Sequence, residues 1–320
     1  MRGGYVGRLA PSPTGALHLG NVRTFMAAWL RARQSGGKIF LRIEDLDHPK
    51  HKEGADRQAV EDLRWLGFDW DAEFVQSERK ELYAAALAKL QGKGLAYPCV
   101  CSRRDVEAVQ SAPHEGEQLH YPGTCRGRFR SWAEAVAFMN PDDGARAAKC
   151  SPRLPCWRFR TPEKSHVAFD DVFAGRFEMD VSSRLGDFPL ARDENGAGYA
   201  IAVTVDDAEM GVTEVVRGDD LLPATPLQIL LYDALGYEAP AFFHVPLVVG
   251  PDGRRLAKRH GDTRIAAFRA AGIKPEDIIG FLAWASGITP KRTPTRLKSL
   301  IGIFDPSRIP HEPLVFRGLT

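Results

Sequence analysis

The chain has 320 residues, of which 44% are hydrophobic and 26% charged, and its net charge is +2. This balance is typical of a globular protein, and the net charge alone argues neither for nor against a nucleic-acid partner. The first residues lack the apolar stretch of a signal peptide, and no run approaches the roughly 18 apolar residues of a membrane helix. We therefore expect a cytoplasmic protein without a membrane partner, built from two domains or from one α/β body with an insertion, and a monomer.

The first residues of the chain alternate between strand-like and helix-like patterns. Two apolar runs, "YVGRLAP" and "KIFLRIED", predict buried strands, the first of them ended by proline. Between them, apolar residues from Leu19 to Leu30 recur at three- and four-residue steps, which is typical of one face of a helix. Residues 5–43 therefore predict a βαβ unit and a parallel sheet. Further helices are expected at about 54–66 and 79–92.

The pattern changes from Tyr97 to about Asn195, where cysteines, prolines, arginines and short β-like pieces replace the βα alternation. This change predicts an inserted α+β domain. Beyond it, "GYAIAVTVDD", "VTEVVRGDD" and "FFHVPLVVG" predict strands, and "TPLQILLYDALG" predicts a helix, so the α/β body resumes. We expect four divisions: residues 1–98 and 196–250 as the two halves of a parallel-sheet body, 99–195 as the insert, and 251–320 as a basic loop with a short helical C-terminal segment.

The stretch "RLAPSPTGALHLGN" at residues 8–21 joins the first predicted strand to the first predicted helix. In parallel α/β sheets, ligands bind at the carboxyl ends of strands and at helix N-termini, and this stretch lies at both. Its irregular backbone leaves N–H groups available, so a phosphate would fit there, and His18 could donate a hydrogen bond to it. The spacing is equally consistent with His18 as a helix-capping residue.

A basic stretch, "VGPDGRRLAKRHGD", follows the last apolar strand. Between Arg254 and Lys274 there are seven lysines and arginines and one acidic residue, Asp262. Such a run is often simply a solvated surface. A basic loop at the end of a strand can also close over a polyphosphate, and Lys258 would then stabilise the charge that develops during phosphoryl or nucleotidyl transfer.

Together the two stretches resemble the signature elements of class I aminoacyl-tRNA synthetases, with "HLGN" in place of their HIGH element and "RLAKR" in place of their KMSKS loop. "FLRIEDLD", "GYAIAVTVDD" and "VTEVVRGDDLLPATPLQILL" are similar to glutamyl-tRNA synthetase, in the same order, and the similarity runs from about residue 7 to 290. The resemblance implies a Rossmann-like catalytic domain. Asn21, Arg255 and Ala257 depart from the usual motif residues, whereas Lys258 is kept.

The end of the chain separates two related families. Only about thirty residues follow "FLAWASGIT", too few for the anticodon-binding domain of a full-length glutamyl-tRNA synthetase. This pattern, with Leu221 in "RGDDLL", resembles the glutamyl-Q tRNA(Asp) synthetase family. The resemblance implies ATP-dependent formation of glutamyl-adenylate and glutamate transfer to the queuosine base at the wobble position of tRNA(Asp), with the anticodon stem-loop as partner. The alternatives are a short discriminating or non-discriminating glutamyl-tRNA synthetase, another nucleotidyltransferase, and a non-catalytic RNA-binding paralogue.

An acidic amino acid presents two carboxylates, which suit arginine, and one ammonium, which suits a glutamate side chain. Arg8 and Arg217 lie at predicted strand ends that face one cleft, although Arg217 could instead pair with Asp219 or Asp220 at the surface. Asp206 and Asp207 are interpreted as loop carboxylates near the cleft, and not as dedicated Mg²⁺ ligands. The resemblance implies a glutamate site of Arg8, Leu9, Ala10, Pro11, Ser12, Glu44 (for the α-amino group), Tyr199 and Arg217, an ATP site of His18, Gly20, Asn21 and Lys258 with Mg²⁺ on the ATP, and His18 and Lys258 as catalytic residues.

The five cysteines, an odd number in a chain without a predicted signal peptide, argue against a disulfide framework. Cys99, Cys101 and Cys125 lie within 27 positions, and three thiolates favour one structural zinc ion. Spacing alone favours His120 as the fourth ligand, with His114 behind it. The resemblance instead implies a C-x-C and Y-x3-C pattern, in which Tyr121 is the fourth ligand. Cys150 and Cys156 are expected to bind nothing.

Overall fold

The computed structural model describes most of the chain, and all structural statements below concern that part. The described residues are 4–13, 15–46, 52–109, 119–141, 153–192, 194, 198–254, 256 and 262–319.

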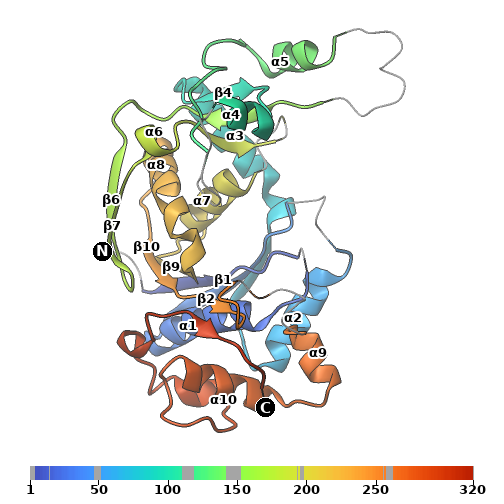
Figure 1. The fold of residues 1–320 in the computed structure, drawn as a ribbon, viewed down its shortest axis with the longest axis vertical. Coiled ribbons are helices and arrows are strands. Elements are labelled where there is room, and N and C mark those ends of the chain that lie inside the picture. The colour runs from blue at the N-terminus through green and yellow to red at the C-terminus, as the bar shows by residue number, and fades with distance from the viewer. Residues whose placement is uncertain are drawn as a thin grey trace.

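A parallel sheet lies at the centre of the fold, as the sequence predicted (Figure 1). Strands β1 (Val6–Leu9), β2 (Lys38–Ile43) and β3 (Ala72–Val75) pair in that order. Strands β9 (Glu214–Gly218) and β10 (Ala241–Val245) form a second parallel pair. A backbone hydrogen bond of 2.8 Å from Thr213 to Val6 brings β9 beside β1. The sheet is therefore completed by segments about 200 residues apart in the chain.

Helices cover this sheet with apolar side chains on both faces. Helix α1 (Leu19–Gln34) crosses from β1 to β2 and buries Val22, Met26 and Leu30 among others, which confirms the expected three- and four-residue spacing. It ends where Gly36 adopts a φ of +62° and Gly37 passes so close to Tyr5 that a Cβ would lie 2.3 Å from the Tyr5 carbonyl oxygen. The remaining helices of this body are α2 (Ala55–Trp65), η2 (Gln76–Arg79), α3 (Lys80–Gly92), α7 (Tyr199–Glu209), η3 (Asp219–Ala224) and α8 (Thr225–Leu235).

The prediction of a strand for "GYAIAVTVDD" is wrong, because these residues form helix α7. The alternation of β-branched residues suggested a strand. In the structure Ile201–Asp207 are all buried, since α7 packs between α3, α8 and strand β8 (Phe188–Ala191). A helix that is buried on every side shows no amphipathic period, so periodicity cannot distinguish it from a buried strand.

Antiparallel strands and short helices interrupt the parallel sheet between α3 and α7 (Figure 1). Strand β5 pairs antiparallel with both β4 and β8, and β6 and β7 form a hairpin whose sequence was predicted as β-like. The hairpin lies along β10, to which the backbone N–H of Val172 donates a 2.8 Å hydrogen bond at Phe242. The bounds are β4 (Ala96–Cys99), α4 (Arg103–Val109), α5 (Trp132–Met139), β5 (Cys156–Phe159), β6 (His166–Asp171), β7 (Gly175–Asp180) and α6 (Val181–Arg184).

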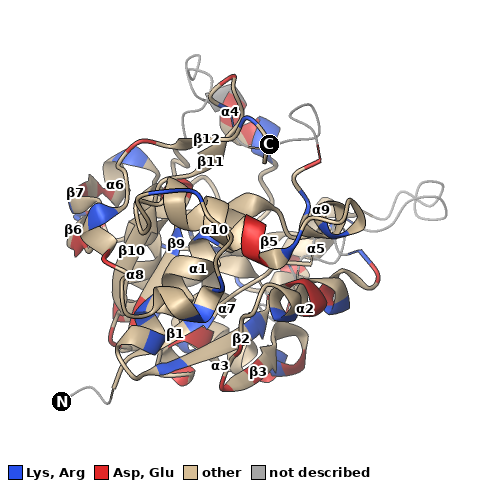
Figure 2. Cartoon of the chain, turned by 90° about the horizontal axis from the view of Figure 1, so that it is seen from below, with Lys and Arg blue, Asp and Glu red and all other residues tan. Residues whose placement is uncertain are grey.

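The C-terminal segment is folded onto the parallel-sheet body rather than standing apart from it. Strand β12 (Leu314–Val315) pairs in parallel with β11 (Val248–Val249), and Phe304, Ile309 and Phe316 join the same core as α1. In the view from this end, basic and acidic residues are interspersed along the ribbon, in line with the small net charge (Figure 2). The other elements here are α9 (Ile265–Ala270), α10 (Pro275–Ala285), η5 (Leu297–Leu300) and η6 (Pro306–Arg308). None of the helices in the described ranges is long and apolar enough to cross a membrane.

Candidate active site and metal centre

A cleft of about 570 Å³ opens at the carboxyl ends of β1, β2 and β9, beside the first turns of α1 and α7. This is the edge at which parallel α/β sheets bind ligands. Residues from separate segments of the chain line it together, among them Arg8 and Arg217, which we expected to face one cleft. The predicted site residues that line it are Arg8, Ala10, Ser12, His18, Gly20, Asn21, Glu44, Tyr199 and Arg217.

Two predicted contact residues flank the cleft without lining it. The Leu9 side chain is part of the hydrophobic core, and Pro11 is buried, with its carbonyl oxygen accepting the backbone N–H of Glu44 at 3.0 Å. The predicted catalytic Lys258, together with Arg255 and Ala257, lies outside the described residues. Leu256, between these positions, lines the cleft.

His18 caps helix α1 at the cleft. Its Nδ1 accepts the backbone N–H of Gly20 at 3.1 Å, and its own backbone N–H donates to the Asn21 side chain at 3.1 Å, which forms a capping box. Because Nδ1 is an acceptor, the proton of the neutral ring is on Nε2, where it can be donated to an anion. The structure therefore shows His18 as the helix cap and places it in the lining of the cleft, and its hydrogen bond to a phosphate stays a prediction.

Residues that follow the basic stretch contact this helix start. The backbone of Leu19 donates to Thr263 at 3.2 Å, and that of Ile265 donates to Leu17 at 2.9 Å. These bonds hold the residues that follow the predicted basic loop against the residues that flank His18. Sequence positions about 245 apart are thereby joined at the place where a helix N-terminus favours negative charge.

A buried ion network supports Arg8 and Glu44 from below the cleft. The Arg42 guanidinium lies 2.9 Å from a Glu44 carboxylate oxygen and 2.6 Å from Asp207, and Asp207 also lies 3.4 Å from Arg8 Nε. Although burial opposes it, the carboxylates of Asp207, Glu44 and Asp206 raise the pKa of Arg42. Arg42 is thus a permanent cation that fixes Glu44 at the cleft.

The interpretation of Asp206 and Asp207 as loop carboxylates is wrong. Both are buried in the last turns of α7, where Asp206 accepts hydrogen bonds from Gln76, Arg79 and Tyr83 at 2.8–2.9 Å. Their carboxylates are used to hold arginines, and neither lines the cleft. Arg42 was not among the predicted site residues, although an arginine within the apolar run "KIFLRI" indicates a buried cation that needs carboxylate partners.

Arg217 is a buried cation whose contacts are neutral. Its Nε donates to His244 Nε2 at 2.9 Å and its Nη2 to the Thr225 hydroxyl at 2.8 Å, while its buried Nη1 has no hydrogen-bond partner among the described residues. The alternative surface pair with Asp219 or Asp220 is not among its contacts in the described part of the chain. Burial and the nearby Arg8 lower the pKa of Arg217. A buried arginine whose charge is not neutralised by a carboxylate favours binding of an anionic ligand in the cleft.

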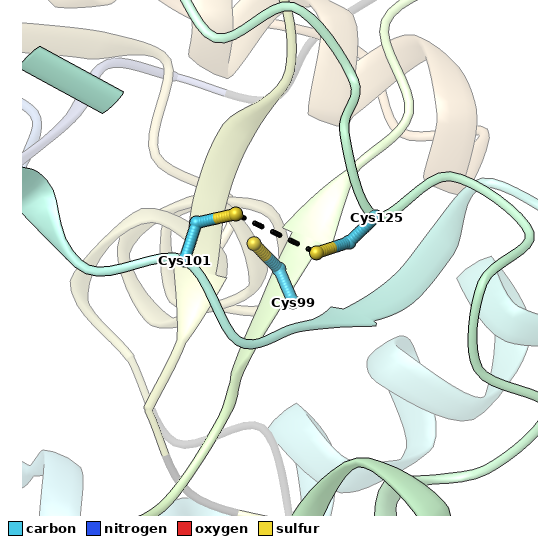
Figure 3. Close-up of side chains that lie close together, drawn as sticks. All are labelled: Cys99, Cys101 and Cys125. Carbon is cyan, nitrogen blue, oxygen red and sulfur yellow. Dashed lines mark hydrogen bonds between the residues drawn. The ribbon is translucent and has the colours of Figure 1, made fainter. Parts of the chain in front are cut away.

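Three cysteines converge at the end of β4, away from the cleft. The sulfurs of Cys99, Cys101 and Cys125 lie within 4.8 Å of one another and could hold a metal ion (Figure 3). The Cys101 and Cys125 sulfurs are 3.6 Å apart. Arg158 donates to the Cys99 sulfur at 3.1 Å, and its cation offsets negative charge on thiolates. Cys156 faces Cys99 across the strand pair but is not part of this group, and Cys150 lies outside the described residues.

The two candidates for a fourth ligand point in different directions. The Tyr121 hydroxyl lies 3.2 Å from the Cys99 sulfur and 3.7 Å from the Cys101 sulfur, and accepts the backbone N–H of Cys125 at 2.9 Å. The His120 ring instead lies 3.3 Å from the carbonyl oxygen of Ser182. His114 lies outside the described residues. The residues present fit a metal with three sulfur ligands and one oxygen ligand.

Comparison with known proteins assigns the family. The catalytic domain of the class I tRNA synthetases (E and Q) matches residues 6–304. The chain belongs to this family. Glutamyl-Q tRNA(Asp) synthetase from Symbiobacterium thermophilum is 48% identical, over 96% of this chain and 94% of that protein, and the protein of the same name from Rhodopirellula baltica is 45% identical, over 98% and 97%. These relatives place the chain among the glutamyl-Q tRNA(Asp) synthetases, which are tRNA ligases within the family.

Longer relatives match this chain over part of their own length. Glutamate–tRNA ligase from Aquifex aeolicus is 38% identical over 97% of this chain but only 63% of its own length. The crystal structure of a glutamate tRNA ligase from Elizabethkingia meningosepticum, in complex with its amino acid, superposes with a TM-score of 0.79 at 27% identity, covering 98% of this chain and 67% of that one. The Rossmann-like class I synthetase fold is thereby confirmed.

Proposed function

We propose that the chain activates L-glutamate with ATP and transfers the glutamyl group to the queuosine base at the wobble position of tRNA(Asp). The structural observation that carries this proposal is the buried, unneutralised Arg217 in a cleft that also contains the N-terminus of α1. The cleft thus offers a site for a carboxylate beside a site for phosphate. The choice of queuosine as acceptor is supported by the names of the relatives that are 42–48% identical over nearly the whole chain.

We assign recognition of glutamate to two arginines and one glutamate side chain that line the cleft at separate positions. Arg8 and Arg217 bind carboxylates, and Glu44, fixed by Arg42, binds the α-ammonium. Tyr199, Ala10 and Ser12 shape the remaining wall, whereas Leu9 and Pro11 support it from the core. The arginines provide planar forks that match carboxylates, and their charge attracts the acidic substrate into the cleft.

Activation is an in-line displacement at the α-phosphorus of ATP. An oxygen of the substrate α-carboxylate forms a bond to this phosphorus while the bond to the β,γ-pyrophosphate oxygen breaks, so that pyrophosphate leaves with the electron pair. His18 Nε2–H, the positive end of the α1 helix dipole and Lys258 stabilise the developing negative charge. Gly20 and Asn21 complete the ATP site. Mg²⁺, carried by ATP, would neutralise phosphate charge.

Transfer then joins the glutamyl group to the modified base. A hydroxyl oxygen of the queuosine cyclopentene ring attacks the carbonyl carbon of glutamyl-adenylate, the hydroxyl proton is released, and AMP leaves. The acceptor hydroxyl belongs to the RNA, so no protein nucleophile is required. The anticodon loop is a suitable substrate because unpaired RNA loops present bases that can be turned into a pocket.

We propose one structural zinc ion, held by Cys99, Cys101, Tyr121 and Cys125. Zinc would provide a four-coordinate cross-link between the end of β4 and the loop that precedes α5, and such closed sites contribute to folding rather than to chemistry. The division into residues 1–98, 99–195, 196–250 and 251–320, the monomeric state and the cytoplasmic location stay proposals. A cytoplasmic location is favoured because ATP and tRNA are available there.

The zinc ligands can be tested by metal content. The Tyr121→Phe variant is expected to lose more zinc than His120→Ala, because the Tyr121 hydroxyl lies beside the Cys99 sulfur whereas the His120 ring lies against Ser182. Zinc bound per chain is measured by atomic emission after dialysis against a weak chelator, with the unchanged chain at about one zinc. Greater zinc loss in His120→Ala would assign the fourth position to His120.

Amino-acid specificity tests the proposed function most directly. In ATP–pyrophosphate exchange with each amino acid, L-glutamate is expected to be activated at least about 10³-fold better than L-glutamine, measured as kcat/KM. Glutamine replaces a carboxylate oxygen by an NH₂ group, which would face the arginine donors and leave a buried charge unpaired. Equal exchange with glutamine, or exchange with no amino acid, would contradict the proposal.

A further inference from the structure

Three buried side chains are hydrogen-bonded in a row that connects the insert to Arg217. Arg217 on β9 and His244 on β10 are directly opposite each other in the parallel register, and the Arg217 Nε–H donates to His244 Nε2 at 2.9 Å. On the other side of the ring, His244 Nδ1 lies 2.6 Å from the carboxylate of Asp171, at the end of β6. All three residues are buried, and His244 is completely inaccessible to solvent.

The hydrogen bonds fix the tautomer of His244. An arginine side chain is always a donor, so Nε2 of the imidazole must accept from it, and the ring proton must be on Nδ1. That proton is then donated to Asp171. A second proton on Nε2 would face the Arg217 Nε–H and remove the hydrogen bond. Arg217 is therefore held in this geometry only by a neutral His244 with its proton on Nδ1.

Asp171 is itself fixed by the hairpin turn. Its Oδ1 accepts the backbone N–H groups of Phe173 at 3.0 Å and Ala174 at 2.8 Å, and its carboxylate also accepts the backbone N–H of His244 at 3.2 Å. Thr225, from α8, holds the other end of the Arg217 fork at 2.8 Å. The only nitrogen of the guanidinium without a partner in the described part of the chain is Nη1, and Arg217 lines the cleft.

We infer that Asp171 and His244 are positioning residues that orient Arg217 toward the substrate carboxylate without neutralising its charge. This inference rests on the proposed role of Arg217 in binding glutamate. A carboxylate in direct contact with Arg217 would compete with the substrate carboxylate for the guanidinium. The neutral His244 ring, between Asp171 and Arg217, instead fixes the orientation of the guanidinium and leaves its positive charge available to the substrate. The arrangement also makes the hairpin of the insert, residues 166–180, part of the support of the amino-acid site.

The protonation state of His244 provides a readout that a purely structural role would not give. Three charged groups face the ring: Asp171 from β6, Arg217 from β9 and Asp219 from η3. Burial and Arg217 lower its pKa, while Asp171 and Asp219 oppose this, and the net shift is downward. His244 is therefore neutral above its ordinary pKa of about 6.5, and protonates only as the pH falls below that value.

The experiment measures KM for L-glutamate and for ATP in ATP–pyrophosphate exchange, from pH 5.0 to 8.0, for the full chain, four test variants and one control variant. Asp171→Asn removes the charge that fixes the tautomer, and at pH 7.5 we expect KM for glutamate to rise about tenfold, which corresponds to 1.4 kcal/mol, with KM for ATP unchanged. His244→Gln keeps an uncharged acceptor near Nε2 and should stay within about threefold of the parent at pH 7.5. His244→Leu, which has no acceptor, should raise KM for glutamate at least as much as Asp171→Asn.

The pH dependence of KM for glutamate distinguishes neutral from protonated His244. In the parent chain, KM for glutamate is expected to rise as the pH falls below about 6.5, whereas in His244→Gln this acid-limb increase should be absent, because glutamine has no titrating group. Asp180→Asn is the matched control, since Asp180 lies on the same hairpin, is exposed and caps α6 without contacting His244. Thermal unfolding of each variant, followed by circular dichroism, identifies the temperature range in which all are folded.

The outcomes distinguish this inference from the proposed function. If Asp171→Asn and His244→Leu lower the unfolding temperature but leave KM for glutamate unchanged in the folded range, the residues are only structural and the inference is overturned. An acid-limb increase that persists in His244→Gln would also overturn it. The fourth variant, Arg217→Gln, tests the premise: if its KM for glutamate is unchanged, the proposed role of Arg217 fails, whatever the other variants do.

Discussion

An isolated anticodon stem-loop of tRNA(Asp) that contains queuosine is expected to accept glutamate from this chain, and the same RNA with guanosine at the wobble position is expected to accept none. Guanosine lacks the cyclopentene hydroxyls that attack glutamyl-adenylate, so the loss should be complete. Transfer of radiolabelled glutamate to the two synthetic RNAs measures the difference. Phosphate contacts dominate protein–RNA affinity and weaken with salt, so both RNAs should compete for binding at low ionic strength.

The 3′ end of the tRNA provides the control for this prediction. Removal of the terminal CCA from intact queuosine-containing tRNA(Asp) should leave glutamate transfer unchanged, because the acceptor lies in the anticodon loop. If transfer requires an intact 3′-terminal ribose and proceeds equally well on tRNA without queuosine, the product is an ordinary aminoacyl ester. The proposed acceptor would then be wrong, whereas the proposed activation of glutamate would be unaffected.

Replacing Arg217 by glutamine is expected to lower kcat/KM for glutamate on the order of 10²–10⁴-fold, because loss of one partner of a buried charge pair costs about 3–5 kcal/mol. The effect should fall mainly on KM for glutamate, since the guanidinium has no assigned role at the phosphates. ATP–pyrophosphate exchange with varied glutamate measures it. The free protein should not be strongly destabilised, because Arg217 has no carboxylate partner to leave unpaired among its contacts in the described residues.

Arg176→Gln is the matched control for this variant. Arg176 is an exposed arginine on β7 that pairs with Asp170 and Glu178, and it does not line the cleft. Exposed ion pairs contribute little, so this substitution should leave both glutamate activation and stability nearly unchanged. Equal kinetics of a folded Arg217→Gln and Arg176→Gln would mean that the glutamate carboxylates are bound elsewhere.

The sequence was most informative where a local pattern is enough to determine structure. The βαβ unit of residues 5–43, with His18 at the start of its helix, follows from apolar spacing and proline positions, and it was confirmed. Helix α7 was missed because all of its faces are buried, so no period marks it. That error also misplaced Asp206 and Asp207, whose carboxylates point into the interior to hold Arg42, Arg79 and Arg8.

Contacts between distant segments could not be predicted from local patterns. The pairing of Arg217 with His244 and Asp171 joins three strands from two parts of the chain, and none of the three residues stands in a pattern that indicates the other two. The fourth metal ligand could not be chosen between His120 and Tyr121 from the sequence for a similar reason. Adjacent residues of an extended backbone point to opposite sides, so spacing cannot tell which one faces the cysteines.

The discontinuous sheet has a consequence for synthesis of the chain. Strand β1 contacts β9 through Tyr5 and Glu214, Val6 and Thr213, and Arg8 and Val216, which are 207–209 residues apart. At the roughly 5–20 residues per second of translation, β1 emerges about 10–40 s before its neighbour exists. During this interval strand β1, which pairs with β2 on its other side, presents an unpaired edge that can associate with other nascent chains. Chaperone supply should therefore limit the yield of folded protein at high expression more than the stability of the finished fold does.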